Sequence, residues 1–159
     1  MNPAAPDYLT VTSLEACFEF VAYSSPAGGA RTLLSKPGQV ERDARGRAQL
    51  LHFAPRRLLV PTPTASVKNE LLDFEARGVG VLVDVEGRWR SLHVEGPPAW
   101  HLLASTIDID SVLRDRGCAA VPLFDCPSIV AREGSAFDLW ITSSYLEGFL
   151  AHARPFGSG

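Results

Sequence analysis

The stretch from Gly78 to Leu103, GVGVLVDVEGRWRSLHVEGPPAWHLL, decides the fold class of this chain. Residues 79–85 are rich in β-branched side chains, and residues 88–94 alternate between two faces, so both segments are predicted strands. In the second strand, one face carries Trp89, Ser91 and His93, and the opposite face carries Arg90, Leu92 and Val94. Glu86-Gly87 between the strands predicts a hairpin turn.

A helix is predicted directly after the second strand. Gly96 is expected as its N-cap and Pro97 as its first residue, because proline lacks an N–H that the first turn would leave unused. Its apolar face comprises Ala99, Leu102 and Leu103. The helix is therefore expected to pack on the neighbouring strands.

The first part of the chain, residues 1–47, is expected to contain a helix, a strand and a charged connection. Thr12 and Glu15 have capping-box spacing, which predicts a helix from Thr12 or Ser13 to about residue 24. Its predicted apolar face comprises Leu14, Cys17, Phe18 and Val21. Residues 30–35 are a predicted strand, and residues 36–47 are a charged connection rich in turn-forming residues.

Residues 48–153 are expected to form an α+β domain, and residues 154–159 a flexible tail. Strands are predicted at 48–53 and 58–61 around a turn at 54–56. An amphipathic helix is predicted over 64–76, with Gly78 as its C-terminal cap and an apolar face of Val67, Leu71, Leu72 and Phe74.

The chain contains an internal echo. The strand at 58–61 leads into a helix, and the later strand around residues 139–142 also leads into a helix through Ser143 and Ser144. Two similar strand-helix-strand halves predict a two-layer sandwich of antiparallel sheet and helices.

The order of the motifs resembles that of the gamma subunit of heterotetrameric sarcosine oxidases. The resemblance extends over roughly residues 50–152, and its motifs are Val83-Asp84-Val85, Gly96-Pro97 with Ala99 and Leu102-Leu103, Asp108 to Asp110, Cys118-Ala119, and Phe137 to Phe149. It implies a fold similar to the folate-binding domain of aminomethyltransferases.

The resemblance also implies a function. It implies a non-catalytic structural subunit of a multi-subunit flavin-dependent oxidase of sarcosine or another N-methyl amine. The alpha and beta partner subunits would hold FAD, FMN, NAD and tetrahydrofolate, and this chain would hold no cofactor. Two alternatives stay open: a folate-dependent one-carbon transferase domain, and a stand-alone interaction module.

Composition favours an ordinary cytoplasmic domain. The 159 residues are 46% hydrophobic and 21% charged, and the net charge of −3 is unlike the basic surface that nucleic acid requires. Three widely spaced cysteines fit a reducing compartment better than a disulfide framework. No apolar run approaches the ~20 residues of a membrane helix.

Few residues are candidates for chemistry. The four histidines are not spaced as metal ligands, so no metal site is expected. Asp84 is either a turn residue or, by the resemblance, a ligand of the folate pterin ring. The folate-dependent alternative requires Asp84 or Asp108 in a pocket. Asp108 and Asp110 are either paired acids or turn residues, with Asp110 as a helix N-cap. His101 is expected to be partly buried, and a proton shuttle is its alternative role.

Large aromatic side chains are the remaining candidates. Aromatic residues are enriched at the centres of protein interfaces, although most of them are found in cores. The candidates for partner contact are Trp89, Trp100, Tyr145 and Phe149.

Overall fold

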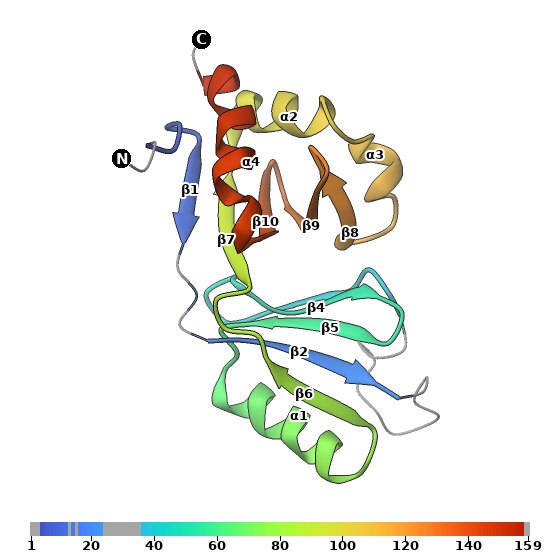
Figure 1. Cartoon of the computed structure of the whole chain (residues 1–159). Coiled ribbons are helices and arrows are strands. Elements are labelled where there is room, and N and C mark those ends of the chain that lie inside the picture. Colours follow the sequence, from blue (N-terminus) through green and yellow to red (C-terminus); the bar gives the residue numbers. More distant parts are fainter. Residues whose placement is uncertain (1–3, 13, 15, 24–35, 158–159) are drawn as a thin grey trace. The chain divides into compact units, whose positions relative to one another are not determined.

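The computed structural model describes residues 4–12, 14, 16–23 and 36–157 (Figure 1). The chain forms two compact units: unit 1 contains residues 1–13 and 87–159, and unit 2 contains residues 14–86. We expected boundaries at residues 47 and 153, whereas the chain passes between the units after residues 13 and 86. Each unit has a five-stranded antiparallel sheet with helical cover, so the predicted α+β class is confirmed.

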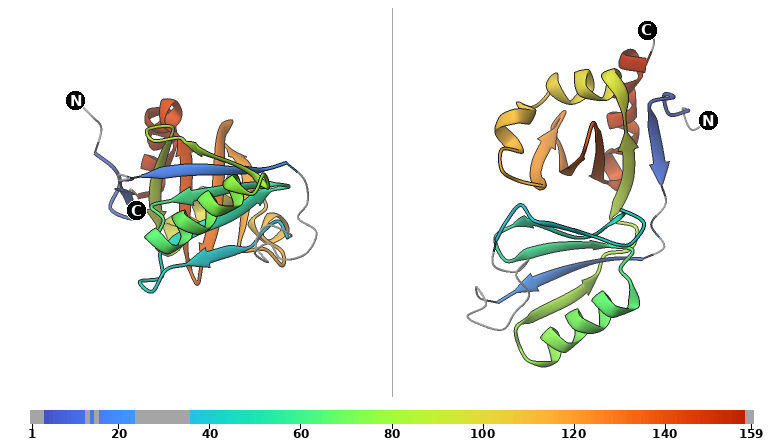
Figure 2. Two further views of the ribbon diagram at one scale, coloured as in Figure 1. Left: turned by 90° about the horizontal axis from the view of Figure 1, so that it is seen from below. Right: turned by 180° about the vertical axis from the view of Figure 1, so that it is seen from behind.

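In the described part of unit 2, a helix covers one face of the sheet, as both views in Figure 2 show. Its strand order is β3-β4-β5-β2-β6. The elements are β2 (Cys17–Ala22), β3 (Val40–Arg42), β4 (Ala48–Ala54), β5 (Arg57–Pro61), α1 (Ala65–Ala76) and β6 (Gly80–Asp84).

The core of unit 2 lies between α1 and the sheet. Alternate residues of β2, β4 and β5 point toward the helix, as the period of two along a strand requires. Phe20 and Phe74 meet with their ring centroids 6.3 Å apart. The buried cluster comprises Phe20, Ala22, Leu50, Leu58, Val60, Val67, Leu71 and Phe74. Leu72, which we expected on this face, is 42% exposed.

Unit 1 has the strand order β1-β7-β10-β9-β8. The strands are β1 (Leu9–Thr12), β7 (Trp89–Val94), β8 (Cys118–Leu123), β9 (Cys126–Glu133) and β10 (Ala136–Thr142). The helices are α2 (Gly96–Ala104), α3 (Ile109–Val112) and α4 (Leu146–Ala153), and short 3₁₀ helices η2 (Ser143–Tyr145) and η3 (Arg154–Gly157) flank α4.

A single apolar cluster joins the helices of unit 1 to its sheet. It includes Leu92 and Val94 of β7, Leu102 and Leu103 of α2, and Phe149 of α4. The predicted helix after β7 is confirmed as α2, although Glu95 rather than Gly96 is its N-cap. Its expected buried face is also confirmed.

The predicted flexible tail is wrong for residues 154–157. These residues form η3, and a Cβ on Gly157 would lie 2.9 Å from the Cβ of Pro6. The Tyr8 hydroxyl donates a 2.6 Å hydrogen bond to the Ala153 carbonyl. Burial raises the pKa of this phenol to about 12. The end of α4 is therefore attached to the segment that leads into β1.

The two units repeat one topology, which confirms the internal echo. In unit 2, β2 precedes the meander β3-β4-β5 and then α1; in unit 1, β7 precedes the meander β8-β9-β10 and then α4. In both sheets the last meander strand pairs with the first strand. The edge beside that first strand is filled by β6 in unit 2 and by β1 in unit 1.

The helix predicted near residues 12–24 is wrong, because residues 17–22 form the strand β2. Phe18 and Phe20 belong to one face of this strand, whereas Cys17 and Glu19 belong to the other. Both faces are buried or half-buried, so the sequence is nearly continuously apolar and helical spacings occur in it by chance. Ser13, Glu15 and the strand predicted at 30–35 lie outside the described residues.

The hairpin predicted around Glu86-Gly87 is also wrong. β6 pairs with β2, whereas β7 pairs with β1 and β10 of the other sheet. Gly87 has a φ of 80°, so a tight turn is present where we expected one. The turn connects the two units instead of two paired strands.

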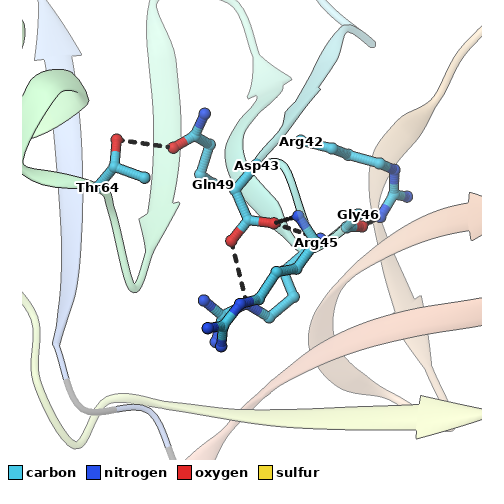
Figure 3. A network of polar contacts seen from close by, with 7 residues as sticks. Arg42, Asp43, Arg45, Gly46, Gln49 and Thr64 are labelled. Carbon is cyan, nitrogen blue, oxygen red and sulfur yellow. Dashed lines mark hydrogen bonds and ion pairs between the residues drawn. The ribbon is translucent and has the colours of Figure 1, made fainter.

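The charged connection at 36–47 contains β3 and a tight turn that follows it (Figure 3). Asp43 accepts hydrogen bonds from the backbone N–H groups of Arg45 and Arg47, at 2.9 and 3.0 Å. Partial desolvation opposes ionisation, but these bonds and the Arg47 side chain lower the pKa of Asp43. Close by, the Thr64 hydroxyl donates to Gln49 and accepts the Val67 N–H, which confirms the predicted start of α1.

Candidate partner-binding site

Three carboxylates were considered for folate binding or acid-base chemistry, and two of them, Asp84 and Asp108, have local structural roles. Asp84 is exposed at the end of β6 and accepts a 2.9 Å hydrogen bond from the Glu86 N–H, as a turn residue does. Asp108 is exposed and accepts the Ser111 N–H at 3.2 Å, so it caps α3. Asp110, which we expected as the cap, lies inside the first turn.

The four aromatic candidates for partner contact divide into two pairs. Trp89 is 6% exposed and Phe149 is fully buried, so neither side chain is available at a surface. Trp100 is 36% exposed and Tyr145 is 45% exposed. The interface prediction is therefore wrong for the first pair, whereas the second pair has the exposure that a contact needs.

Trp100 lies on α2 and lines a pocket of about 490 Å³. The Arg132 guanidinium lies 5.7 Å from the centre of its ring, and the Phe137 ring centroid is 6.3 Å away. Both of these side chains pack against the half-exposed indole. The pocket, which we call the α2–α3 pocket, is lined by Trp100, Ala104, Ser105, Thr106, Ile107, Asp108, Ile109 and Asp110. It brings together three candidate residues of the sequence analysis, Trp100, Asp108 and Asp110.

A second hollow of unit 1, of about 660 Å³, lies between β1 and the start of α4. We call it the β1–α4 groove, and its lining residues are Ala5, Leu9, Thr10, Val11, Arg90, Ser143, Ser144, Leu146, Glu147 and Leu150. Sequence analysis did not identify this groove, because β1 was not predicted. One signal was present: Arg90 is a charge on the otherwise apolar face of its strand.

The cysteines are buried free thiols. Burial, reinforced by Glu19 and Asp84, raises the pKa of Cys17 to about 12, and burial raises that of Cys118 to about 12 despite nearby Arg116. Burial and the neighbouring Asp125 also raise the pKa of Cys126. Thiols with raised pKa values are poor nucleophiles at neutral pH.

Metal and membrane sites were also considered. Among the residues that the structure describes, no three His, Cys, Asp or Glu side chains gather as metal ligands. Within the same ranges, no helix combines the length and apolar character needed to cross a membrane. His101, which we expected to be partly buried, is exposed on α2.

His93 and Asp138 form a cross-strand pair between β7 and β10, with Nδ1 of His93 2.8 Å from Oδ1 of Asp138. The hydrogen bond to Asp138, assisted by the charges of Asp138, Glu95 and Glu133, raises the pKa of His93 against partial desolvation. The imidazolium therefore stabilises the folded state below the ordinary histidine pKa of about 6.5, and this contribution is lost as the pH rises through the folded-state pKa.

We expect Asp138→Asn to destabilise the protein more at about pH 5.5 than at about pH 8.5. His93 is 38% exposed, so solvent screening limits the difference to about 0.5 kcal/mol. Urea unfolding of the wild type and of the Asp138→Asn variant at each pH measures this difference in stability loss. An equal loss at both pH values would show that the imidazolium charge contributes nothing.

Comparisons with known proteins give a fold but no sequence family. No protein-family model matches the sequence, and no curated protein matches it. A chain of heterotetrameric sarcosine oxidase from Corynebacterium sp. U-96, solved in complex with pyrrole 2-carboxylate, matches the structure with a TM-score of 0.70. The match covers 95% of this chain and 85% of that chain, at 18% sequence identity. The chain therefore has the α+β fold of a sarcosine oxidase subunit.

Proposed function

We propose that this chain is a non-catalytic subunit of a multi-subunit flavin-dependent oxidase of sarcosine or a related N-methyl amine, in the role of a gamma subunit. The observation that carries the proposal is the fold match, which extends over 95% of the chain. The order of the sequence motifs supports the same assignment independently of the structure.

The roles of the reactive side chains support a structural function. Asp84 and Asp108 accept backbone hydrogen bonds, and His93 is engaged by Asp138. The cysteine thiols are buried and have raised pKa values. In this proposal FAD, FMN, NAD and tetrahydrofolate bind to the alpha and beta partner subunits. The buried free thiols support a cytoplasmic location, where thiols stay reduced.

Two exposed aromatic residues of unit 1, Trp100 and Tyr145, are proposed as partner contacts. Tryptophan and tyrosine are enriched among the residues that dominate binding energy. Trp100 is held by Arg132 beside the α2–α3 pocket, so little side-chain freedom would be lost when a partner covers it.

The proposal predicts that the tagged chain, purified from its source cells, elutes with two larger subunits and with flavin absorbance. Trp100→Ala is expected to weaken retention of those subunits about tenfold or more, as truncation of a central interface tryptophan does. Tyr23→Ala is the matched control, since Tyr23 is a 61% exposed aromatic residue of unit 2.

A colourless single chain in the eluate would contradict the proposal. Titration with tetrahydrofolate then separates the alternatives. Saturable binding that Asp84→Asn or Asp108→Asn abolishes would indicate a folate-dependent domain, whereas no binding would leave an interaction module without a flavoenzyme partner.

A further inference from the structure

We propose that the β1–α4 groove binds an extended segment of a partner polypeptide, which adds a strand to β1 and places a carboxylate against Arg90. The identity of that polypeptide, a subunit of the oxidase, rests on the proposed function. The chemical class of the segment rests on the groove alone.

The outer edge of β1 offers backbone groups for pairing. Among the residues that the structure describes, β1 is the terminal strand of its sheet and pairs with β7 alone. The Glu95 N–H donates to the Tyr8 carbonyl just before β1, so the hydrogen-bonded pairs within β1 fall at Thr10 and Thr12. The N–H and C=O of Val11 therefore point away from β7.

Within Leu9–Thr12, this edge has none of the sequence features that usually protect against pairing. Natural sheet edges are commonly blocked by charged side chains, proline or a bulge. The sequence of β1 is LTVT, and its register with β7 is regular. Val11 is also 38% exposed, although Leu9, on the same face of the strand, is buried. At Val11, both the outward backbone groups and an exposed apolar side chain are therefore available to a partner.

The groove beside this edge can take side chains of an added strand. Its volume of about 660 Å³ is in the range of ordinary ligand sites, which is about 300–1,000 Å³. Leu9 and Val11 contribute from the strand, and Leu146 and Leu150 contribute from α4. An extended peptide places every second side chain on one face, so alternate apolar residues would enter the groove.

Arg90 makes the groove favour a ligand with a negatively charged group. It shares the face of β7 that carries Leu92 and Val94, and it is partly buried. In the part of the chain that the structure describes, Arg90 makes no ion pair or hydrogen bond through its side chain. Glu147 lines the same groove but lies in the first turn of α4, where a negative charge already interacts favourably with the helix dipole.

A polypeptide fits these features better than a small acid does. A small carboxylate could pair with Arg90 but would leave the outer edge of β1 unused. The backbone of an added strand would form hydrogen bonds with the N–H and C=O groups of Val11. An Asp or Glu side chain of the same strand would form charge-assisted hydrogen bonds with the Arg90 guanidinium.

The test is selection of random linear peptides, displayed on phage, on the purified full-length chain. Enriched peptides are expected to alternate apolar residues and to contain Asp or Glu. Synthetic copies should bind Arg90→Glu at least about tenfold more weakly than the wild type, by fluorescence anisotropy, which corresponds to about 1.4 kcal/mol. Arg114→Glu is the matched control, because Arg114 is an exposed arginine of unit 1 outside the groove.

Val11→Pro tests the strand edge separately. Proline removes an outward N–H but no bond to β7, so the unfolding midpoint should be nearly unchanged while peptide binding is lost. Enrichment of no sequence, or equal binding of the peptides to wild type and Arg90→Glu, would overturn the inference. Flavoprotein co-purification is a separate readout, so either proposal can fail while the other holds.

Discussion

Replacing Phe149 by alanine is expected to lower the free energy of unfolding by about 3–5 kcal/mol, as truncation of a fully buried phenylalanine usually does. Phe149 is 0% exposed and belongs to the cluster that joins α4 to the sheet of unit 1. Its ring centroid is 6.1 Å from that of Phe124. The alanine variant loses these contacts and leaves a cavity between helix and sheet.

Tyr145→Ala is the matched control for this measurement. Tyr145 lies four positions earlier on the same helical segment and is 45% exposed, so its truncation should change the free energy of unfolding by about 0.5 kcal/mol or less. Urea unfolding of the two variants beside the wild type gives both values. Similar small losses for both would show that α4 does not pack as the structure has it.

This contrast also shows why the aromatic candidates could not be sorted from the sequence. Residues four apart usually share a helix face, which would place Tyr145 with Phe149. In the structure Tyr145 belongs to η2, a 3₁₀ helix with a tighter period, and α4 begins only at Leu146. The change of helix type turns Tyr145 toward solvent.

Helices and strands whose sequence signals lie within a few residues of the element were predicted correctly. The strands around residues 54–56 and the helix at 64–76 have their signals within a few residues, including the Thr64 cap and the positive φ of Gly78. The start of α2 is marked by Pro97 in the same way. Each signal acts through the adjacent backbone, so it does not depend on which strands later pair.

Pairing between distant strands was not predictable. The sequence of β6 and β7 fits a hairpin as well as it fits two strands in separate sheets, because period and turn residues are the same in both cases. The difference is that β2 and β1, from the first 22 residues, take the partner positions. The β1–α4 groove was missed for the same reason, since one of its walls is β1.

Substituting Gly80 by alanine is expected to cost about 4 kcal/mol or more, at the exceptional end of single substitutions. Gly80 is buried in β6 and pairs with Ala22 of β2. A Cβ at this position would lie 2.3 Å from the Val21 carbonyl oxygen and 2.7 Å from Cζ of Phe20. The first of these atoms belongs to the backbone of the paired strand, so relief requires β2 and β6 to separate.

Gly148→Ala should raise the free energy of unfolding, in contrast to Gly80→Ala. Gly148 is an exposed residue inside α4, and a Cβ there meets no atom within 4 Å. Alanine in a helix interior is favoured over glycine by about 1 kcal/mol, so this variant should be more stable than the wild type. Urea unfolding gives the free energy of unfolding of both variants.

A mild loss of stability for Gly80→Ala, below about 1 kcal/mol, would mean that β6 does not lie against β2 in this register. β6 would then not be the terminal strand of the unit 2 sheet, because its pairing with β2 leaves no room for a side chain at Gly80.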